Sequence, residues 1–173
     1  MKEIIRMYAR YSKRADDSVG TLLKGMDLNK LNETGQTFCG SIMDLYRHIA
    51  GAVLYFHGLI RASIPQAAHS LAESLDPKLA DGLLDAEGLK TLMAALSEAN
   101  QATIDFVDKL SEDDLELPVK LDWYPERETV PLHFILNQLI VHGIHHRGQI
   151  SQTLDQLKVE HDFSGIDLSY MPE

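Results

Sequence analysis

The sequence predicts an all-α fold, a four-helix bundle with a long crossover connection and a short hairpin or extended loop before the last helix. Apolar residues recur at steps of three and four in four long segments, which is the spacing of one face of an α-helix. The second and third segments are joined by a stretch long enough to run from one end of a bundle to the other. Because no repeat, low-complexity run or interdomain linker interrupts the pattern, residues 1–173 are expected to form a single domain.

The first helix is expected over residues 2–26. One face of this segment is apolar and is formed by Ile4, Tyr8, Tyr11, Ala15, Val19, Leu22 and Met26. The charged residues fall mostly outside that face and are expected on a solvated surface: Arg6, Arg10, Lys13, Arg14, Asp16 and Asp17. Four turn-forming residues then predict a loop: Asp27, Asn29, Asn32 and Gly35.

The second helix is expected over residues 37–62. Its apolar face comprises Phe38, Ile42, Leu45, Ile49, Ala52, Phe56 and Leu59. His48 lies beside this face and borders the core, where a lone histidine is more often structural than a metal ligand. Asp44, one turn earlier, either orients the His48 ring by accepting a hydrogen bond or is a surface charge.

The connection over residues 63–84 is irregular, because its period is interrupted by Ser63, Pro65, Pro77, Asp81 and Gly82. It has room for a short helix over residues 66–75, and we expect His69 to be exposed to solvent. The third helix is expected over residues 85–110, with Asp85 as its N-cap. Its apolar face has the most regular spacing in the chain: Leu89, Leu92, Leu96, Ala99, Thr103, Phe106 and Leu110.

Residues 115–130 alternate between apolar and polar or turn residues, which indicates a short hairpin or an extended loop. Pro118 weakens the assignment of a strand. Pro131 suits the first turn of a fourth helix, which is expected to end near Lys158. The tail from Glu160 onward is expected to be irregular and to dock on the bundle through its apolar residues, Phe163, Ile166, Leu168 and Tyr170.

The fourth helix carries a cluster of histidines, two of which lie on one face. His142 and His146 are one turn apart, so their rings can grip a single metal ion. The face that begins with Leu132, Ile135 and Leu139 turns polar at His142, His146, Gln149 and Thr153. Because a buried polar group without a partner is costly, this run indicates a metal ion, a water-filled cavity or a hydrogen-bonded network. The alternatives are a histidine pair in the core or a solvated face.

Two imidazoles from one helix and a third from a facing helix would leave an open position on a metal ion, the pattern of catalytic zinc sites. Zinc, nickel, copper and iron all accept imidazole ligands. His145 points away from the pair, and Arg147 cannot lose its proton to bind a metal. We expect Arg147 to pair with an acidic group or to lie on the surface. Gly143 stands where a His-Glu-x-x-His zinc protease needs its glutamate, so that class is excluded.

The run from His142 to Ile150 resembles the signature of the DinB/YfiT-like superfamily of metalloenzymes. The resemblance covers nearly the whole chain and includes the first helix near Tyr8, Tyr11 and Ala15, the place of His48 in the second helix, and the turn that ends near Pro131. It implies a four-helix bundle with a long crossover connection and a homodimer. It also implies a site in which His48, His142 and His146 bind one divalent metal ion.

The better understood members of that superfamily resemble S-transferases and isomerases that use a small thiol, such as glutathione, mycothiol or bacillithiol. The resemblance therefore implies a metal-dependent enzyme of the thiol S-transferase or isomerase type, with zinc or nickel and a low-molecular-weight thiol cosubstrate. A metal-dependent hydrolase and a non-catalytic dimer that binds a metal or a small molecule are the alternatives. Relatives often carry a tryptophan shortly after the first histidine, where this chain has Tyr55 and Phe56.

Composition narrows the range of partners. The formal net charge of -10 comes without an evident basic patch, which argues against nucleic-acid binding. The single cysteine, Cys39, excludes an internal disulfide and fits a reducing cytoplasm. The sequence lacks the apolar core of a signal peptide and any apolar run of transmembrane length. We therefore expect a cytoplasmic protein that acts on a small molecule and binds neither nucleic acid nor membrane.

Gly148 lies inside the fourth helix, where a glycine costs about 1 kcal/mol relative to alanine. It is either a tolerated surface residue or a point where another helix approaches closely. That helix would belong to the same chain or to a second subunit, and two-fold pairing is the commonest assembly. We expect a homodimer with helix-on-helix contacts.

Overall fold

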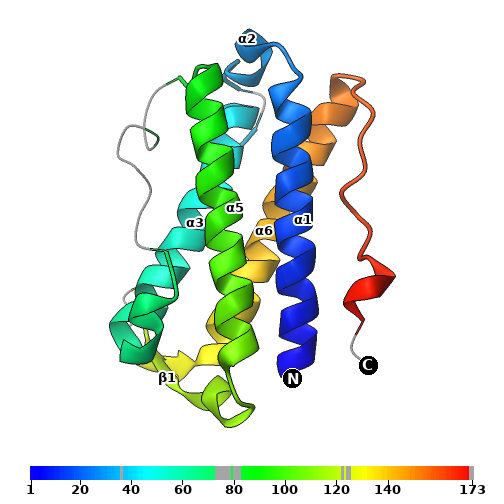
Figure 1. The fold of residues 1–173 in the computed structure, drawn as a ribbon. Helices are drawn as coiled ribbons and strands as arrows, with labels where there is room; N and C mark the ends of the chain where they lie inside the picture. Colours follow the sequence, from blue (N-terminus) through cyan, green and yellow to red (C-terminus); the bar gives the residue numbers. More distant parts are fainter. Residues whose placement is uncertain (36, 73–78, 80–82, 122, 124–125, 172–173) are drawn as a thin grey trace.

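The computed structural model describes residues 1–35, 37–72, 79, 83–121, 123 and 126–171. Within these residues, four long helices form a bundle: α1 (Lys2–Lys24), α3 (Ile42–Ser63), α5 (Ala86–Lys109) and α6 (Leu132–Gln156). The predicted all-α fold is confirmed. In Figure 1, α1 and α6 run upward and α3 and α5 run downward. The chain must therefore return to the far end of the bundle between α3 and α5, which is the long crossover connection.

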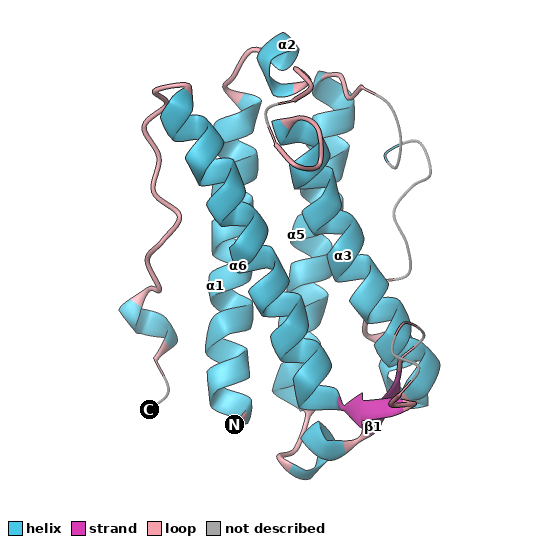
Figure 2. Cartoon of the chain, turned by 180° about the vertical axis from the view of Figure 1, so that it is seen from behind, coloured by secondary structure: helices cyan, strands magenta, loops and turns pink. Residues whose placement is uncertain are grey.

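The packing of the four helices decides which side chains can meet. α1 lies against α5 and α6, and α3 lies against α5 and α6. Figure 2 shows α6 crossing beside α3 on the face that is hidden in Figure 1. The helix that carries His48 is therefore a direct neighbour of the helix that carries His142 and His146.

The start of α3 is fixed by a capping box. The Ser41 hydroxyl accepts a hydrogen bond from the Asp44 backbone N–H at 3.0 Å, and the Asp44 carboxylate accepts one from the Ser41 N–H at 3.0 Å. The expected start near residue 37 is wrong, because this cap holds the helix end at Ile42. Phe38, placed by its spacing on the apolar face, is 97% exposed.

Asp44 does not orient His48, nor is it a simple surface charge. Its carboxylate is taken up by the Ser41 cap and by an ion pair with Arg47 at 3.0 Å.

A short helix, α2 (Leu28–Leu31), lies within the loop that was expected after residue 26, beyond the C-terminal end of α1. The Asp27 side chain caps this helix by accepting a hydrogen bond from Asn29 N–H at 2.9 Å.

The remaining elements largely follow the sequence pattern. Asp85 caps α5, as predicted, by accepting a hydrogen bond from Gly88 N–H at 2.8 Å. The short helix expected within the crossover is a 3-10 helix, η1 (Pro65–His69), and His69 is exposed, as predicted. Residues 73–75 of the expected helix lie outside the described residues.

A hairpin precedes α6, as predicted. After a 3-10 turn, η2 (Asp113–Glu116), β1 (Pro118–Lys120) pairs antiparallel with β2 (Thr129–Pro131), and Val119 faces Val130. Pro131 closes β2 and caps α6, so it precedes the first helical turn that was expected to contain it.

The C-terminal tail docks only in part. The Phe163 carbonyl accepts a hydrogen bond from the Tyr11 hydroxyl at 3.0 Å, and the Phe163 side chain packs against the core. A 3-10 turn, η3 (Leu168–Tyr170), follows, but Leu168 is 80% exposed. The predicted docking is therefore right for Phe163 and wrong for Leu168.

The core contains polar residues that the apolar spacing did not indicate. Asp16, expected on the solvated flank of α1, is buried between α1, α5 and α6. His57 of α3 is also fully buried, and one ring nitrogen, Nε2, lies 2.8 Å from the Thr103 hydroxyl of α5. Burial, with a smaller contribution from Arg61, lowers the pKa of His57 to about 4.

We predict that the metal-free protein loses stability as the pH falls from 6.5 towards 4. In this window the unfolded chain takes up a proton on His57 while the folded chain does not, so unfolding is favoured by up to about 3 kcal/mol. Urea unfolding at pH 7 and pH 5 should show a shallower pH dependence for His57→Gln than for the parent. An identical pH dependence would contradict the assignment.

Candidate metal centre

Three histidines from two neighbouring helices converge at one point. The Nε2 atom of His142 lies 3.2 Å from His48 Nε2 and 3.1 Å from His146 Nε2. Nitrogen ligands that share one zinc ion at about 2.0–2.1 Å lie roughly 3 Å from one another. The sequence singled out these three residues, and the structure brings their rings together at a spacing that a metal ion could bridge.

Hydrogen bonding alone does not satisfy this cluster. His146 Nδ1 lies 2.8 Å from the Gln149 side-chain oxygen, which requires a proton on Nδ1 and leaves a lone pair on Nε2 of the neutral ring. A single N–H on His142 can point well at only one of its two neighbours. A cation between the three rings would satisfy every Nε2 lone pair at once.

The protonation states also suit metal ligands. Burial lowers the pKa of His142 to about 4, and the neighbouring histidines His146, His48 and His145 add to this shift. Burial likewise lowers the pKa of His146, although its hydrogen bond with Gln149 opposes the shift. Both rings are therefore neutral at neutral pH, the form in which histidine binds a metal.

The cluster opens into a cavity of about 820 Å³ on the α3–α6 side of the bundle. His48 is exposed at this opening, whereas His146 is 8% exposed. The walls of the cavity are formed by Cys39, Asp44, Arg47, His48, Gly51, Ala52, Tyr55, Phe56, Trp123, Gln138 and His142. A small molecule could therefore reach the histidines from solvent.

One wall of the cavity is aromatic. The Trp123 ring, from the segment between β1 and β2, lies 5.7 Å from the Tyr55 ring and 6.5 Å from the Phe56 ring, measured between centroids. Phe56 in turn lies 6.1 Å from the His142 ring. Trp123 thus reaches the surroundings of Tyr55 and Phe56 from a distant part of the sequence.

Cys39 is a part of this cluster that the sequence did not indicate. Its sulfur and one ring nitrogen each of His48 and His146 all lie within 4.8 Å of one another. Burial and the nearby Asp44 carboxylate raise the pKa of the Cys39 thiol. Only the position of the helix start at Ile42 reveals that Cys39 lies on a turn beside the histidines.

A buried ion pair lies on the other side of α6. The Arg147 guanidinium donates to Asp16 at 2.8 Å, and the Asn100 amide donates to the second Asp16 oxygen at 2.8 Å. Burial raises the pKa of Asp16, while Arg147 and Asn100 oppose this shift. The prediction that Arg147 pairs with an acidic group is confirmed, with Asp16 as the partner, and the alternative that Arg147 lies on the surface is wrong.

Gly143 makes room for that arginine. A Cβ atom on Gly143 would lie 3.0 Å from the Arg147 guanidinium. The glycine that excludes the zinc-protease class therefore also has a packing role. Next to Arg147 in the sequence, His146 faces α3, so α6 uses two adjacent faces for polar contacts.

The comparison with protein families agrees with this architecture. The family model described as the DinB family matches residues 1–161. The chain belongs to the DinB family. The comparison with curated proteins finds no match. Three observations therefore describe this protein: its membership of the DinB family, its helical fold and its His/Cys cluster.

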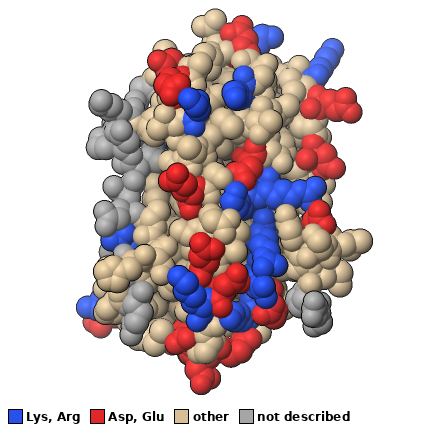
Figure 3. Space-filling view, in the orientation of Figure 1, with Lys and Arg blue, Asp and Glu red and all other residues tan. Residues whose placement is uncertain are grey.

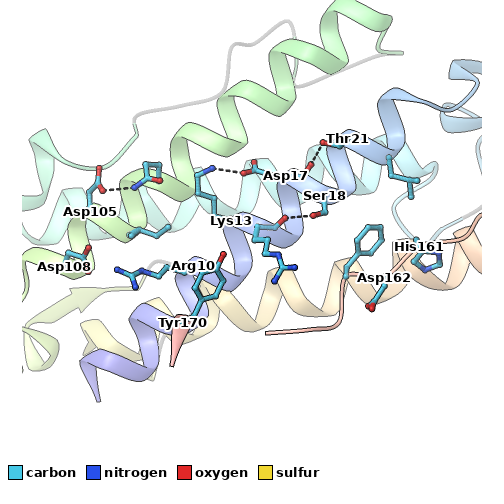
Figure 4. Close-up of a pocket in the computed structure, with 15 residues that line it drawn as sticks. Arg10, Lys13, Asp17, Ser18, Thr21, Asp105, Asp108, His161, Asp162 and Tyr170 are labelled. Atoms are coloured by element: carbon cyan, nitrogen blue, oxygen red, sulfur yellow. Dashed lines mark hydrogen bonds and ion pairs between the residues drawn. The ribbon is translucent and has the colours of Figure 1, made fainter. Parts of the chain in front are cut away.

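A second depression, of about 860 Å³, lies on the opposite side of the DinB-family bundle, between α1, α5 and the C-terminal tail (Figure 4). Its charged residues are largely engaged with one another. Lys13 pairs with Asp17 at 2.6 Å and donates to Ser97 at 2.9 Å, and Arg14 pairs with Asp167 at 3.2 Å. Figure 3 shows basic and acidic side chains intermingled on this face. The cavity beside His48 is therefore the stronger candidate site.

Two expectations about α6 can be compared with its surroundings. His145 is exposed to solvent, as expected for a residue that points away from the pair. Around Gly148, no described atom lies within 4 Å of an added Cβ. The prediction of close approach by a helix of the same chain is therefore wrong.

No helix in the described part of the chain has the length and apolarity to cross a membrane.

We predict that breaking the Asp16–Arg147 pair from one side strongly destabilises the protein. Asp16→Leu or Arg147→Met leaves one buried charge without its partner, which typically costs about 3–5 kcal/mol. The double variant Asp16→Leu/Arg147→Met should be less destabilised than the sum of the two single changes. Urea unfolding curves give these free energies, and additive losses would show that the two side chains act independently.

Proposed function

We propose that this DinB-family protein is a metal-dependent enzyme whose His48, His142 and His146 bind one divalent ion, most simply zinc or nickel. The observation that carries the proposal is the convergence of three Nε2 atoms beside a cavity open to solvent. Three protein nitrogens leave a coordination position free, as catalytic sites require. We propose the thiol S-transferase or isomerase type of reaction, with a low-molecular-weight thiol as cosubstrate.

The protein's side chains would hold and orient the site. Gln149 fixes the tautomer of His146 by accepting a hydrogen bond from the Nδ1–H group, which leaves the Nε2 lone pair facing the His142 ring. Low pKa values keep His142 and His146 ready to bind without first releasing a proton. When bound, a divalent ion supplies a positive charge that keeps a thiol in its reactive thiolate form at neutral pH.

The cavity supports a small substrate with an apolar part. Tyr55, Phe56 and Trp123 form an aromatic surface that would bind an apolar electrophile and exclude water from the reacting atoms. Gln138 and the Asp44–Arg47 ion pair give the same cavity polar groups that can recognise the cosubstrate. This division favours the joining of two small molecules.

We predict that the purified protein, loaded with zinc and dialysed, retains one ion per chain. His48→Ala and His142→Ala should each fall well below one ion per chain, because two of the three nitrogens bind a divalent ion weakly. His145→Ala is the matched control and should retain the parent's stoichiometry. Elemental analysis by mass spectrometry measures the content, and equal loading of all variants would reject the site.

The same zinc-loaded preparations separate the three classes of function. Conjugation of a small thiol to a chromogenic aryl halide, lost in His142→Ala and unchanged in His145→Ala, is expected for the proposed transferase. Ester or amide hydrolysis without a thiol would instead favour the metal-dependent hydrolase. Full metal loading without either reaction would favour a non-catalytic binding protein.

We also propose a homodimer that uses the outer face of α6. Phe134, Val141 and Ile144 are 46%, 57% and 38% exposed, and together with Gly148 they form one stripe along this helix. Apolar residues and a glycine on one exposed face suit close packing of two helices.

We predict a dimer mass in light scattering at micromolar concentration. Val141→Glu should shift the protein towards the monomer, because it places a charge in the middle of the paired stripe. Leu83→Glu is the control, since Leu83 is 79% exposed and lies outside α6. A parent protein of monomer mass would overturn the dimer.

A further inference from the structure

We infer that Cys39 is an exchangeable fourth ligand, which closes the metal site at rest and is displaced by the incoming thiol. The inference rests on the proposed three-histidine site and deepens it. Its basis is the cluster in which the Cys39 sulfur lies within 4.8 Å of ring nitrogens of both His48 and His146. The same two histidines also neighbour His142, whose Nε2 atom lies 3.2 Å from His48 Nε2 and 3.1 Å from His146 Nε2.

Cys39 and His142 are both neighbours of His48 and His146. Zinc prefers four ligands, and sulfur together with imidazole is a common donor set. Cys39 therefore supplies a fourth donor of a suitable type beside the three histidines.

The turn that carries Cys39 is tied to the helix that carries His48. Thr37 and Gly40 exchange two backbone hydrogen bonds of 3.1 Å each, which places Phe38 and Cys39 at the tip of a tight turn. Gly40 has a φ of 117°, and a Cβ atom there would lie 2.8 Å from the Asp44 carboxylate. Only glycine fits this position without strain.

The capping box then joins the turn to α3. Ser41 begins the helix, and His48 follows seven residues later, which is two turns along the same face. The sulfur and the His48 ring are thus held by one continuous, hydrogen-bonded unit. The hydrogen-bonded turn fixes the backbone of Cys39, and the exchange requires only a rotation of the Cys39 side chain away from the histidines.

The exchange needs no oxidant. The incoming thiol gives its proton to the Cys39 sulfur and enters the site as a thiolate, while Cys39 leaves as a neutral thiol. One proton moves from one sulfur to the other, and no net charge is created. Cys39 lines the cavity by which the thiol would enter, so the two sulfurs can exchange places there.

Cobalt substitution tests the ligation. The cobalt-loaded parent should show the near-ultraviolet charge-transfer band of a thiolate–cobalt bond, together with visible bands from the histidine ligands. Cys39→Ala should keep one cobalt per chain and lose only the charge-transfer band. Phe38→Ala, on the same turn and 97% exposed in the parent, is the matched control and should keep both.

The possible results separate the two proposals. Stoichiometric cobalt with the same near-ultraviolet spectrum in the parent and in Cys39→Ala would overturn the fourth ligand and leave the three-histidine site intact. A parent protein that binds no cobalt would overturn both.

Carbon-13 labelling tests the exchange, because the chain has a single cysteine. The Cβ resonance of labelled Cys39 should move when zinc is added to the metal-free protein. Titration with 2-mercaptoethanol should return it to the position of the free thiol, while the zinc content stays at one ion per chain. A resonance that moves with zinc but ignores the added thiol would overturn the exchange and leave ligation standing.

Discussion

The buried ion pair between Asp16 and Arg147 constrains the rest of the bundle. Two charged groups that are 2% and 3% exposed are stable only while they face each other, so α1 and α6 cannot rotate or slide without separating them. Asn100 extends the constraint to α5. Because Arg147 follows His146 directly, the ion pair also fixes which way the histidine face of α6 turns. The orientation of the candidate metal centre therefore depends on an ion pair to which none of the three histidines belongs.

This arrangement explains why α6 is polar on two adjacent faces. One face meets α1 through Arg147, and the other meets α3 through His142 and His146. Arg147 pairs with Asp16 on one face, and His142 and His146 converge with His48 on the other, so one orientation of the helix brings both sets of contacts together. A bundle with only apolar contacts would tolerate several helix rotations. The buried polar contacts therefore fix the rotation of α6 relative to α1 and α3. The neutral histidines contribute to this set of contacts.

Much of the fold could be predicted from the sequence because the helices follow regular apolar spacing. The histidine cluster could also be predicted from the sequence, because His142 and His146 are one helical turn apart and His48 lies beside the apolar face of its helix. What escaped prediction depends on tertiary contacts. Asp16 looks like one more charge on a charged flank, and only its distance to Arg147 shows that it is buried. Phe38 fits the apolar period of a helix that the Ser41 cap prevents from starting there.

Cys39 shows the same limit at the site itself. Its distance from His48 in the sequence suggests no relation, and a continuous helix from residue 37 would have placed it on helical turns well away from the histidine. The capping box replaces those turns with a hairpin-like turn that folds back. A single serine–aspartate interaction therefore decides whether the cluster has three members or four.

The position of Trp123 has a further consequence. In the aromatic wall of the cavity, Tyr55 and Phe56 belong to α3, whereas Trp123 belongs to the connection between the two short strands. The two strands are paired through Val119 and Val130, and a hydrogen bond from the Leu121 N–H to the Glu128 carbonyl at 3.1 Å follows them, so these contacts hold the ends of that connection. Loop length and sequence can therefore diverge while the helices that carry the histidines keep their packing. The aromatic wall therefore depends in part on a hairpin that carries none of the clustered histidines, so related chains could change this wall by exchanging one hairpin while the histidines keep their places.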